Sequence, residues 1–277
     1  MTPLVSTAVI LVGGAFAGII GSLTGLGGGL VIVPLLTLVL HLPVQQAVGV
    51  SLLGVIATSV GAAPRFVGTG LSNIRLALFL QVAASGGALL GALVAHNVPA
   101  RSLFLIFGLV MLYSAVMSFL PTKHDASGAP VDSALAARLR LGSRYRSGEQ
   151  WIDYHVQGVA PAFGLMVGAG LLSAMLGIGS GVFKVLAMDK LMRLPFRVST
   201  ATSNFMIGIT AATSAGYYLA HGEVQPLVAG PVILGVLGGA YLGAHLVHHL
   251  PVRVLRHVFA VVLSFVALDM LLKGFSA

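Results

Sequence analysis

Two glycine-rich stretches interrupt apolar sequence and hold the residues most suited to binding a ligand. The first reads GSLTGLGGGLVIVPLL over residues 21–36, and the second reads GIGSGVFKVL over residues 177–186. Their central residues are Gly27, Gly28 and Gly29 in the first stretch and Gly179, Ser180 and Gly181 in the second. Glycine allows close backbone approach, and N–H groups freed at a helix start bind anions. The pattern predicts an anion site at two broken helices; the alternative is a set of small residues that only pack helices together.

Uncharged polar side chains follow both stretches. Ser203 and Asn204 lie downstream of the second, and Ser51 lies at the position in the first half that corresponds to Ser203. Hydroxyl and amide donors recognise an oxyanion without burying a fixed charge. We predict that these three residues contribute to the anion site. The alternative is hydrogen bonding between helices, worth about 0.6 kcal/mol per bond on average.

Lys184 is the one basic residue placed within an apolar segment, three residues after Gly181. Charges inside a membrane are costly and mark functional sites by default. Lys184 either faces a substrate cavity or extends along the helix to the cytoplasmic surface, because Asp189 and Lys190 follow within two turns. The sequence leaves both interpretations open.

The composition sets the fold class. Hydrophobic residues make up 57% of the 277 residues and charged residues 8%, and the mean hydropathy is +1.00. A soluble domain carries about 25% charged residues. Runs such as 76–95 and 254–272 are long enough to cross a bilayer and lack the alternation of a barrel strand. The sequence therefore predicts an all-α polytopic membrane protein whose first apolar run is a retained span.

The chain is an internal duplication. A shift of 152 positions aligns it with itself, placing Gly25 on Gly177, Pro43 on Pro195 and Ser51 on Ser203. We therefore expect two transmembrane repeats, 1–120 and 157–277, joined by the polar linker 121–156. The expected helical segments are about 4–23, 28–40, 45–63, 75–96 and 102–120, then 157–176, 180–192, 197–219, 226–248 and 253–272. The second segment of each repeat is short for a spanning helix, so it either crosses tilted or folds back beside the first.

Basic residues predict the topology. The linker holds five of them, and the positive-inside rule places it in the cytoplasm. The predicted cytoplasmic side then carries twelve basic residues, including Arg65, Arg75 and Arg253, against two, Arg101 and Lys273, on the other side. The net charge of +8 is typical of such loops and does not indicate nucleic acid. Each repeat must cross an odd number of times, so the two repeats are inverted, as in secondary transporters.

Other candidate features carry less chemistry. No carboxylate or cysteine accompanies the histidines at 245, 248 and 249 to complete a set of metal ligands, so we expect no metal site. The spacing around Ser180 fits no nucleophile motif, the chain has no cysteine or phosphate-binding loop, and we expect neither an enzyme nor a cofactor. Asp269 lies near the outer end of the last segment, where a capping or surface role is expected. The basic stretch LAARLRLGSRYR, residues 135–146, either lies on anionic headgroups or is a solvated loop.

The stretch 21–36, with Pro43 and Ser51 downstream, resembles the signature of the TauE/SafE family of anion transporters, and ATSNFMIGITAATSAGYY (201–218) resembles the matching part of its second half. The resemblance implies a multi-pass protein of the bacterial cytoplasmic membrane. It also implies secondary transport of sulfite, sulfonates such as sulfoacetate, or related carboxylates. An anion channel or a non-transporting membrane subunit is the alternative. A coupling proton or sodium ion and a homo-oligomer are left open, and membrane lipid is the expected surrounding partner.

The second repeat departs from the family pattern. Ser180 replaces the middle glycine, Leu186 stands where the first repeat has Pro34, and Lys184 stands where it has Ile32. The two half-sites are therefore chemically unequal.

Single cysteines test the predicted topology directly, because the chain has none of its own. A cysteine in the 121–156 linker should react with a membrane-impermeant maleimide only after the membrane is opened, whereas a cysteine at either terminus should react in intact cells. Labelling of the linker in intact cells would contradict the inverted arrangement.

Overall fold

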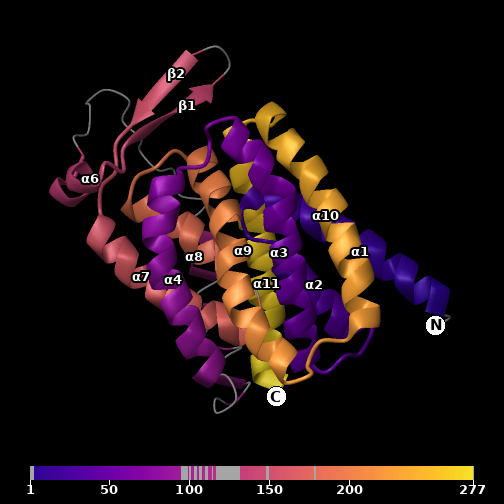
Figure 1. Cartoon of the computed structure of the whole chain (residues 1–277). Helices are drawn as coiled ribbons and strands as arrows, with labels where there is room; N and C mark the ends of the chain where they lie inside the picture. The colour runs from indigo at the N-terminus through magenta and orange to yellow at the C-terminus, as the bar shows by residue number, and fades with distance from the viewer. Residues whose placement is uncertain are drawn as a thin grey trace.

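The computed structural model is a bundle of helices with a small appendage at one end (Figure 1). It describes residues 3–94, 99, 101–102, 105, 108–109, 112–113, 115–116, 132–147, 150–177 and 179–276. The first repeat forms α1 (Pro3–Thr24), α2 (Gly29–Pro34), a π-helical turn η1 (Leu35–Val39), α3 (Val44–Gly68) and α4 (Ile74–Val94). The linker forms α6 (Ala134–Leu139), β1 (Ser143–Ser147) and β2 (Gln150–Tyr154). The second repeat forms α7 (Val159–Leu176), α8 (Gly181–Leu186), the π-helical turn η3 (Ala187–Leu191), α9 (Phe196–Ala220), α10 (Pro226–His249) and α11 (Val252–Ser276).

Five helices among the described residues are long and apolar enough to cross a membrane: α1, α3, α4, α7 and α10. Large apolar side chains face outward on them, such as Val82 on α4 and Leu227 on α10. Lipid can cover such side chains, and all backbone groups within a helix are paired. The all-α polytopic fold is thereby confirmed. The predicted segment 102–120 falls largely outside the described residues.

The short second helix of each repeat folds back beside the first helix. Gly28, at the start of α2, lies against Ala17 of α1, and Leu35 of η1 reaches Gly13. In the second repeat the backbone N–H of Gln157 donates to the carbonyl of Met192 (3.2 Å), so the beginning and end of that unit meet. Each pair is therefore a helical hairpin that begins and ends on one side, and the tilted-crossing alternative is wrong.

The two repeats share local backbone geometry in detail. Left-handed φ angles occur at both members of several pairs that are 152 positions apart, and the two π-helical turns also match. The pairs are Gly25 and Gly177, Gly27 and Gly179, Gly28 and Ser180, His41 and Arg193, and Gly70 and Gly222. Five of the six tip positions are glycine, because a side chain is strained at such angles.

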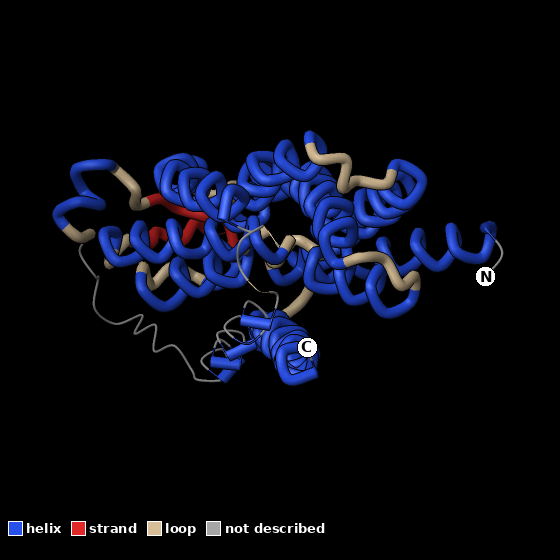
Figure 2. Tube along the Cα trace, turned by 90° about the horizontal axis from the view of Figure 1, so that it is seen from below, coloured by secondary structure: helices blue, strands red, loops and turns tan. Residues whose placement is uncertain are grey.

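Equivalent helices of the two repeats run antiparallel at the centre of the bundle. Gly49 at the start of α3 lies near Tyr218 at the end of α9. Further along, the Ser59 hydroxyl donates to the Phe205 carbonyl (3.3 Å). This antiparallel contact supports the inverted repeat, and the orientation in the membrane stays a prediction. Figure 2 shows the C-terminal helix α11 set apart from the main band of helices.

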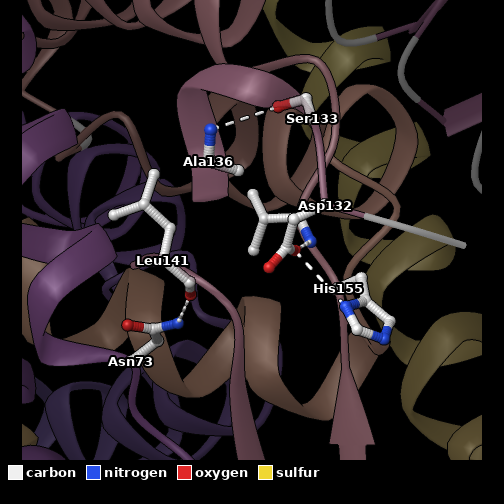
Figure 3. A network of polar contacts seen from close by, with 7 residues as sticks. Asn73, Asp132, Ser133, Ala136, Leu141 and His155 are labelled. Carbon is white, nitrogen blue, oxygen red and sulfur yellow. Dashed lines mark hydrogen bonds and ion pairs between the residues drawn. The ribbon is translucent and has the colours of Figure 1, made fainter. Parts of the chain in front are cut away.

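The linker forms a small folded unit (Figure 3). Leu141, Tyr154 and Val156 are buried in it. The Asn73 amide, between α3 and α4, donates to the Leu141 carbonyl (2.8 Å) and to the Tyr154 hydroxyl (3.0 Å). Burial raises the pKa of Tyr154, so the hydroxyl stays protonated at neutral pH.

A second contact closes this unit. Asp132 accepts a hydrogen bond from the Val156 N–H (2.6 Å) and lies 3.6 Å from His155. The solvated-loop interpretation of residues 135–146 was wrong, and contact of this segment with anionic headgroups stays a prediction. The stretch instead forms α6 and β1, fastened to the end of the bundle.

The contact between α4 and α7 depends on glycine at one position and not at its neighbour. The carbonyl oxygen of Val167 occupies the place where a Gly87 side chain would begin, whereas Gly86 has open space there. We expect Gly87→Ala to lower the free energy of unfolding by about 1–3 kcal/mol through overpacking. The control Gly86→Ala should be neutral or slightly stabilising. Thermal unfolding in detergent measures both, and equal melting temperatures would contradict this packing.

Candidate functional site

The tips of the two hairpins meet inside the bundle. The Gly177 carbonyl oxygen of one tip lies 2.9 Å from where a Gly29 side chain would begin. Symmetrically, the Gly25 carbonyl leaves no room for a side chain at Gly181. Each tip therefore lies against the first turn of the short helix of the other hairpin. The close approach expected of these glycines is present, and it is mutual.

Two serines hold the tips together. The Ser51 hydroxyl donates to the Gly177 carbonyl (2.9 Å), and the Ser203 hydroxyl donates to the Gly25 carbonyl (2.7 Å). Both serines are fully buried, and each crosses from a long helix of one repeat to the tip of the other. A hydroxyl has one proton to donate. In this conformation both serines therefore serve as links between helices, and direct anion binding by them stays a prediction.

Asn204 shows a different arrangement from the one expected. Its amide nitrogen donates to the carbonyls of Ser22 (2.8 Å) and Thr200 (3.1 Å), so both N–H bonds are used. Its amide oxygen is buried and has no partner within the described residues. The free group of Asn204 is thus an acceptor, which suits a hydroxyl, a water or a protonated ligand atom.

Donors for an anion remain on the tip backbone. Within the described residues, three consecutive N–H groups at the start of each short helix make no hydrogen bond. They belong to Gly28, Gly29 and Leu30 in the first hairpin and to Ser180, Gly181 and Val182 in the second. The Ser180 hydroxyl does not add to them, because it donates to the Gly179 carbonyl (2.7 Å). These N–H groups are the donors that a helix start leaves free.

Lys184 is buried in the same short helix as the second donor set, where its backbone N–H donates to the Ser180 carbonyl (3.1 Å). Its side chain is 0% exposed, so it does not extend to the cytoplasmic surface. The ammonium contacts the Thr210 hydroxyl, and within the described part of the chain it has no carboxylate partner. The three neighbouring helices α4, α7 and α9 contain no aspartate or glutamate. Lys184 is therefore a buried basic side chain without a fixed counter-charge.

Gln81 and Ser85 of α4 complete the polar surroundings of Lys184, and sequence reasoning missed both. The Gln81 amide lies 2.9 Å from the Thr210 hydroxyl and 2.7 Å from the Ser85 hydroxyl. When the amide oxygen faces these hydroxyls, the amide nitrogen donates to the Met206 carbonyl and both ends are satisfied. A glutamine in the middle of an apolar segment was the available signal.

Apolar side chains close the space between the tips. Val55 of α3 lies against both Gly27 and Gly179. Ile207 of α9, which corresponds to Val55 in the second repeat, reaches Gly27. Both side chains are fully buried. The donor set and Lys184 are thus enclosed in this conformation, so access for a ligand requires the tips or these side chains to move.

Comparison with known proteins gives a consistent result. Residues 10–270 match the family model described as sulfite exporter TauE/SafE. The chain is 28% identical to the probable membrane transporter protein YunE of Bacillus subtilis, covering 97% of this chain and 98% of that protein. It is 27% identical to a probable membrane transporter protein of Haemophilus influenzae, covering 94% and 96%. No solved structure matches the chain.

The link from Ser203 to the opposite tip can be tested against a serine on the same helix. Ser203→Ala leaves the buried Gly25 carbonyl without its donor and should cost about 1–3 kcal/mol of stability. Ser214 is equally buried, but its hydroxyl bonds the Thr210 carbonyl within α9 (3.3 Å). Ser214→Ala should therefore have little effect. Equal melting temperatures of the two variants would show that Ser203 does not hold the tip.

Proposed function

We propose that this chain, which belongs to the sulfite exporter TauE/SafE family, transports small sulfur-containing anions across the membrane. The substrates would be sulfite, sulfonates such as sulfoacetate, or related carboxylates, and the membrane would be the bacterial cytoplasmic membrane. The energy source would be a gradient, since the sequence contains no phosphate-binding loop for ATP.

One observation carries the proposal: a buried lysine without a counter-charge lies one helical turn from the unpaired N–H groups that begin α8, and the second set of such groups is on the opposing tip. An unpaired ammonium in a low-dielectric interior costs several kcal/mol. A small anion offsets that cost and, with several oxygens, accepts hydrogen bonds from both tips at once. Sulfite and sulfonate groups each present three oxygens in a compact shape, which fits donors arriving from two sides.

The pairing of the tips suggests how the site opens. The tips belong to opposite repeats, and the contacts between them are matched pairs: Ser51 with Gly177, and Ser203 with Gly25. Moving one hairpin would expose the donors to one side of the membrane, and moving its counterpart would expose them to the other. This alternation distinguishes a transporter from the channel alternative, which needs one continuous path.

We also propose that a proton enters with the anion and resides on Lys184. When the site is empty, no acid of α4, α7 or α9 compensates a charge on Lys184. The other titratable groups of these helices lie near their ends: Arg75 at the start of α4, Arg197 at the start of α9, and Tyr217 and Tyr218 near the end of α9. Asp189 pairs with Lys190 (3.7 Å). Anion binding would then draw a proton onto Lys184.

Flux measurements test the function. Proteoliposomes should take up labelled sulfite or sulfonate faster than empty vesicles, with saturation at high concentration. Lys184→Met should raise the apparent KM roughly 10- to 150-fold, because a charge contact of about 1.5–3 kcal/mol is lost. The matched control Ile32→Met introduces the same side chain at the corresponding position of the first repeat without removing a basic group, and should keep the wild-type KM. A wild-type KM in Lys184→Met would exclude the lysine from the site.

Proton coupling has a separate readout. A pH-sensitive dye inside the vesicles should report proton entry that depends on the anion in the wild type. Lys184→Met, at an anion concentration high enough to restore flux, should carry the anion without that signal. Anion-dependent proton entry that persists in Lys184→Met would place the proton elsewhere while leaving the transporter proposal intact.

A further inference from the structure

An open groove of about 660 Å³ lies on the outer surface between α3 and α10, away from the hairpin tips. Its lining comes from Val60, Gly61, Pro64 and Arg65 of α3 and from Leu234, Leu237, Gly238, Tyr241 and His245 of α10. Gly238 has open space where a side chain would begin, which leaves a shallow floor between the two helices. Val60 and Leu234, on the apolar walls, are 60% and 65% exposed.

The groove is apolar along its length and basic at one end. Gly54 of α3 lies near Val232 of α10, and Gly61 lies near Leu237, so the two helices run parallel. Arg65 and His245 both lie in the last turns of their helices and therefore at the same end. That end is on the predicted cytoplasmic side. The groove thus has the polarity of a lipid: apolar toward the membrane centre and cationic at the surface.

The basic end is available to a ligand. Arg65 is exposed, and its guanidinium makes no hydrogen bond or ion pair within the residues that the structure describes. His245 uses its Nδ1 atom against the Tyr241 carbonyl (2.9 Å), which leaves Nε2 free. The Tyr241 and His245 rings pack with centroids 4.6 Å apart, placing an aromatic side chain at the edge of the groove. Arginine and aromatic residues together favour the headgroup region of a membrane.

The internal duplication provides a built-in comparison. The corresponding face between α9 and α4, on the opposite side of the membrane, has Tyr217 in place of Arg65 and Leu93 in place of His245. Its open glycine, Gly86, corresponds to Gly238. Helix packing alone would require neither basic residue, because the equivalent face does without them. The cationic end is a property of the cytoplasmic groove specifically.

We propose that this groove binds one anionic phospholipid of the cytoplasmic leaflet. An acyl chain would lie along Val60 and Leu234, and the phosphate would contact the Arg65 guanidinium beside the His245 ring. The complementary charge selects an anionic lipid over a zwitterionic one. This site is independent of the hairpin tips and of the transported substrate.

Native mass spectrometry of the full chain, released from detergent with added lipid, tests the proposal. The wild type should retain one phosphatidylglycerol about fivefold more tightly than phosphatidylcholine, the factor expected for about 1 kcal/mol from the single arginine contact. Arg65→Gln should abolish that preference. The control Arg75→Gln removes an exposed arginine at the start of α4, outside the groove, and should keep it. Glycerophosphate, which has the headgroup chemistry without acyl chains, should not compete.

A second variant tests the apolar part of the groove. Leu234→Trp fills it from an exposed position, so folding should be preserved and phosphatidylglycerol retention should fall. A preference for phosphatidylglycerol that survives both Arg65→Gln and Leu234→Trp would overturn the proposal. A second result would also overturn the proposal: the wild type is a dimer, and both variants become monomers without any change in lipid retention. The occupant of the groove would then be a second copy of the chain.

Discussion

Irregular backbone inside a membrane must be buried in protein, and the rest of this structure follows from how that requirement is met. Each hairpin tip contains a run of residues with left-handed φ angles that cannot pair their own polar groups in the regular helical pattern. Two tip carbonyls, those of Gly177 and Gly25, accept hydrogen bonds from the opposite repeat, through Ser51 and Ser203. Each tip therefore relies on the other repeat for a hydrogen-bond donor, which is why we expect the duplication and the broken helices to occur together.

The same requirement creates the candidate site. The Gly25 and Gly177 carbonyls of the tips are paired across the repeats, while N–H groups at the start of α2 and α8 are left without partners. These unpaired N–H groups favour a negative charge, whereas the buried amide oxygen of Asn204 remains an unpaired acceptor. Lys184 adds a basic side chain to one half only, since Ile32 occupies the corresponding place and packs in an apolar cluster. Thus the fold supplies a symmetric pair of half-sites, and one substitution makes them unequal.

Much of this arrangement could be predicted from the sequence, because apolar periodicity and glycine placement are local signals. The segments expected at 45–63 and 197–219 correspond to α3 (Val44–Gly68) and α9 (Phe196–Ala220). The expected end at residue 63 was too early, because α3 continues through Pro64 to Gly68. Within a membrane bundle, neighbouring helices compensate the bond that a proline removes, so α3 continues.

What could not be predicted depends on tertiary partners. The linker stretch 135–146 reads as basic and amphipathic, and its fold depends on Asn73, more than sixty positions earlier in the chain, which binds the Leu141 carbonyl. Asn204 was expected to donate to an anion, yet its donors are used by Ser22 and Thr200 on neighbouring backbone. A sequence shows that a polar side chain needs a partner, but it does not show which atom of the fold will be nearest.

The central claim is that an anion binds between the two tips. Anomalous X-ray diffraction from crystals soaked in selenite, a selenium analogue of sulfite, would locate the ligand without assumptions about its shape. The account predicts one selenium peak between the N–H groups of Gly28, Gly29 and Leu30, those of Ser180, Gly181 and Val182, and the Lys184 ammonium. A selenium peak bound elsewhere, in protein that still transports sulfite, would contradict it.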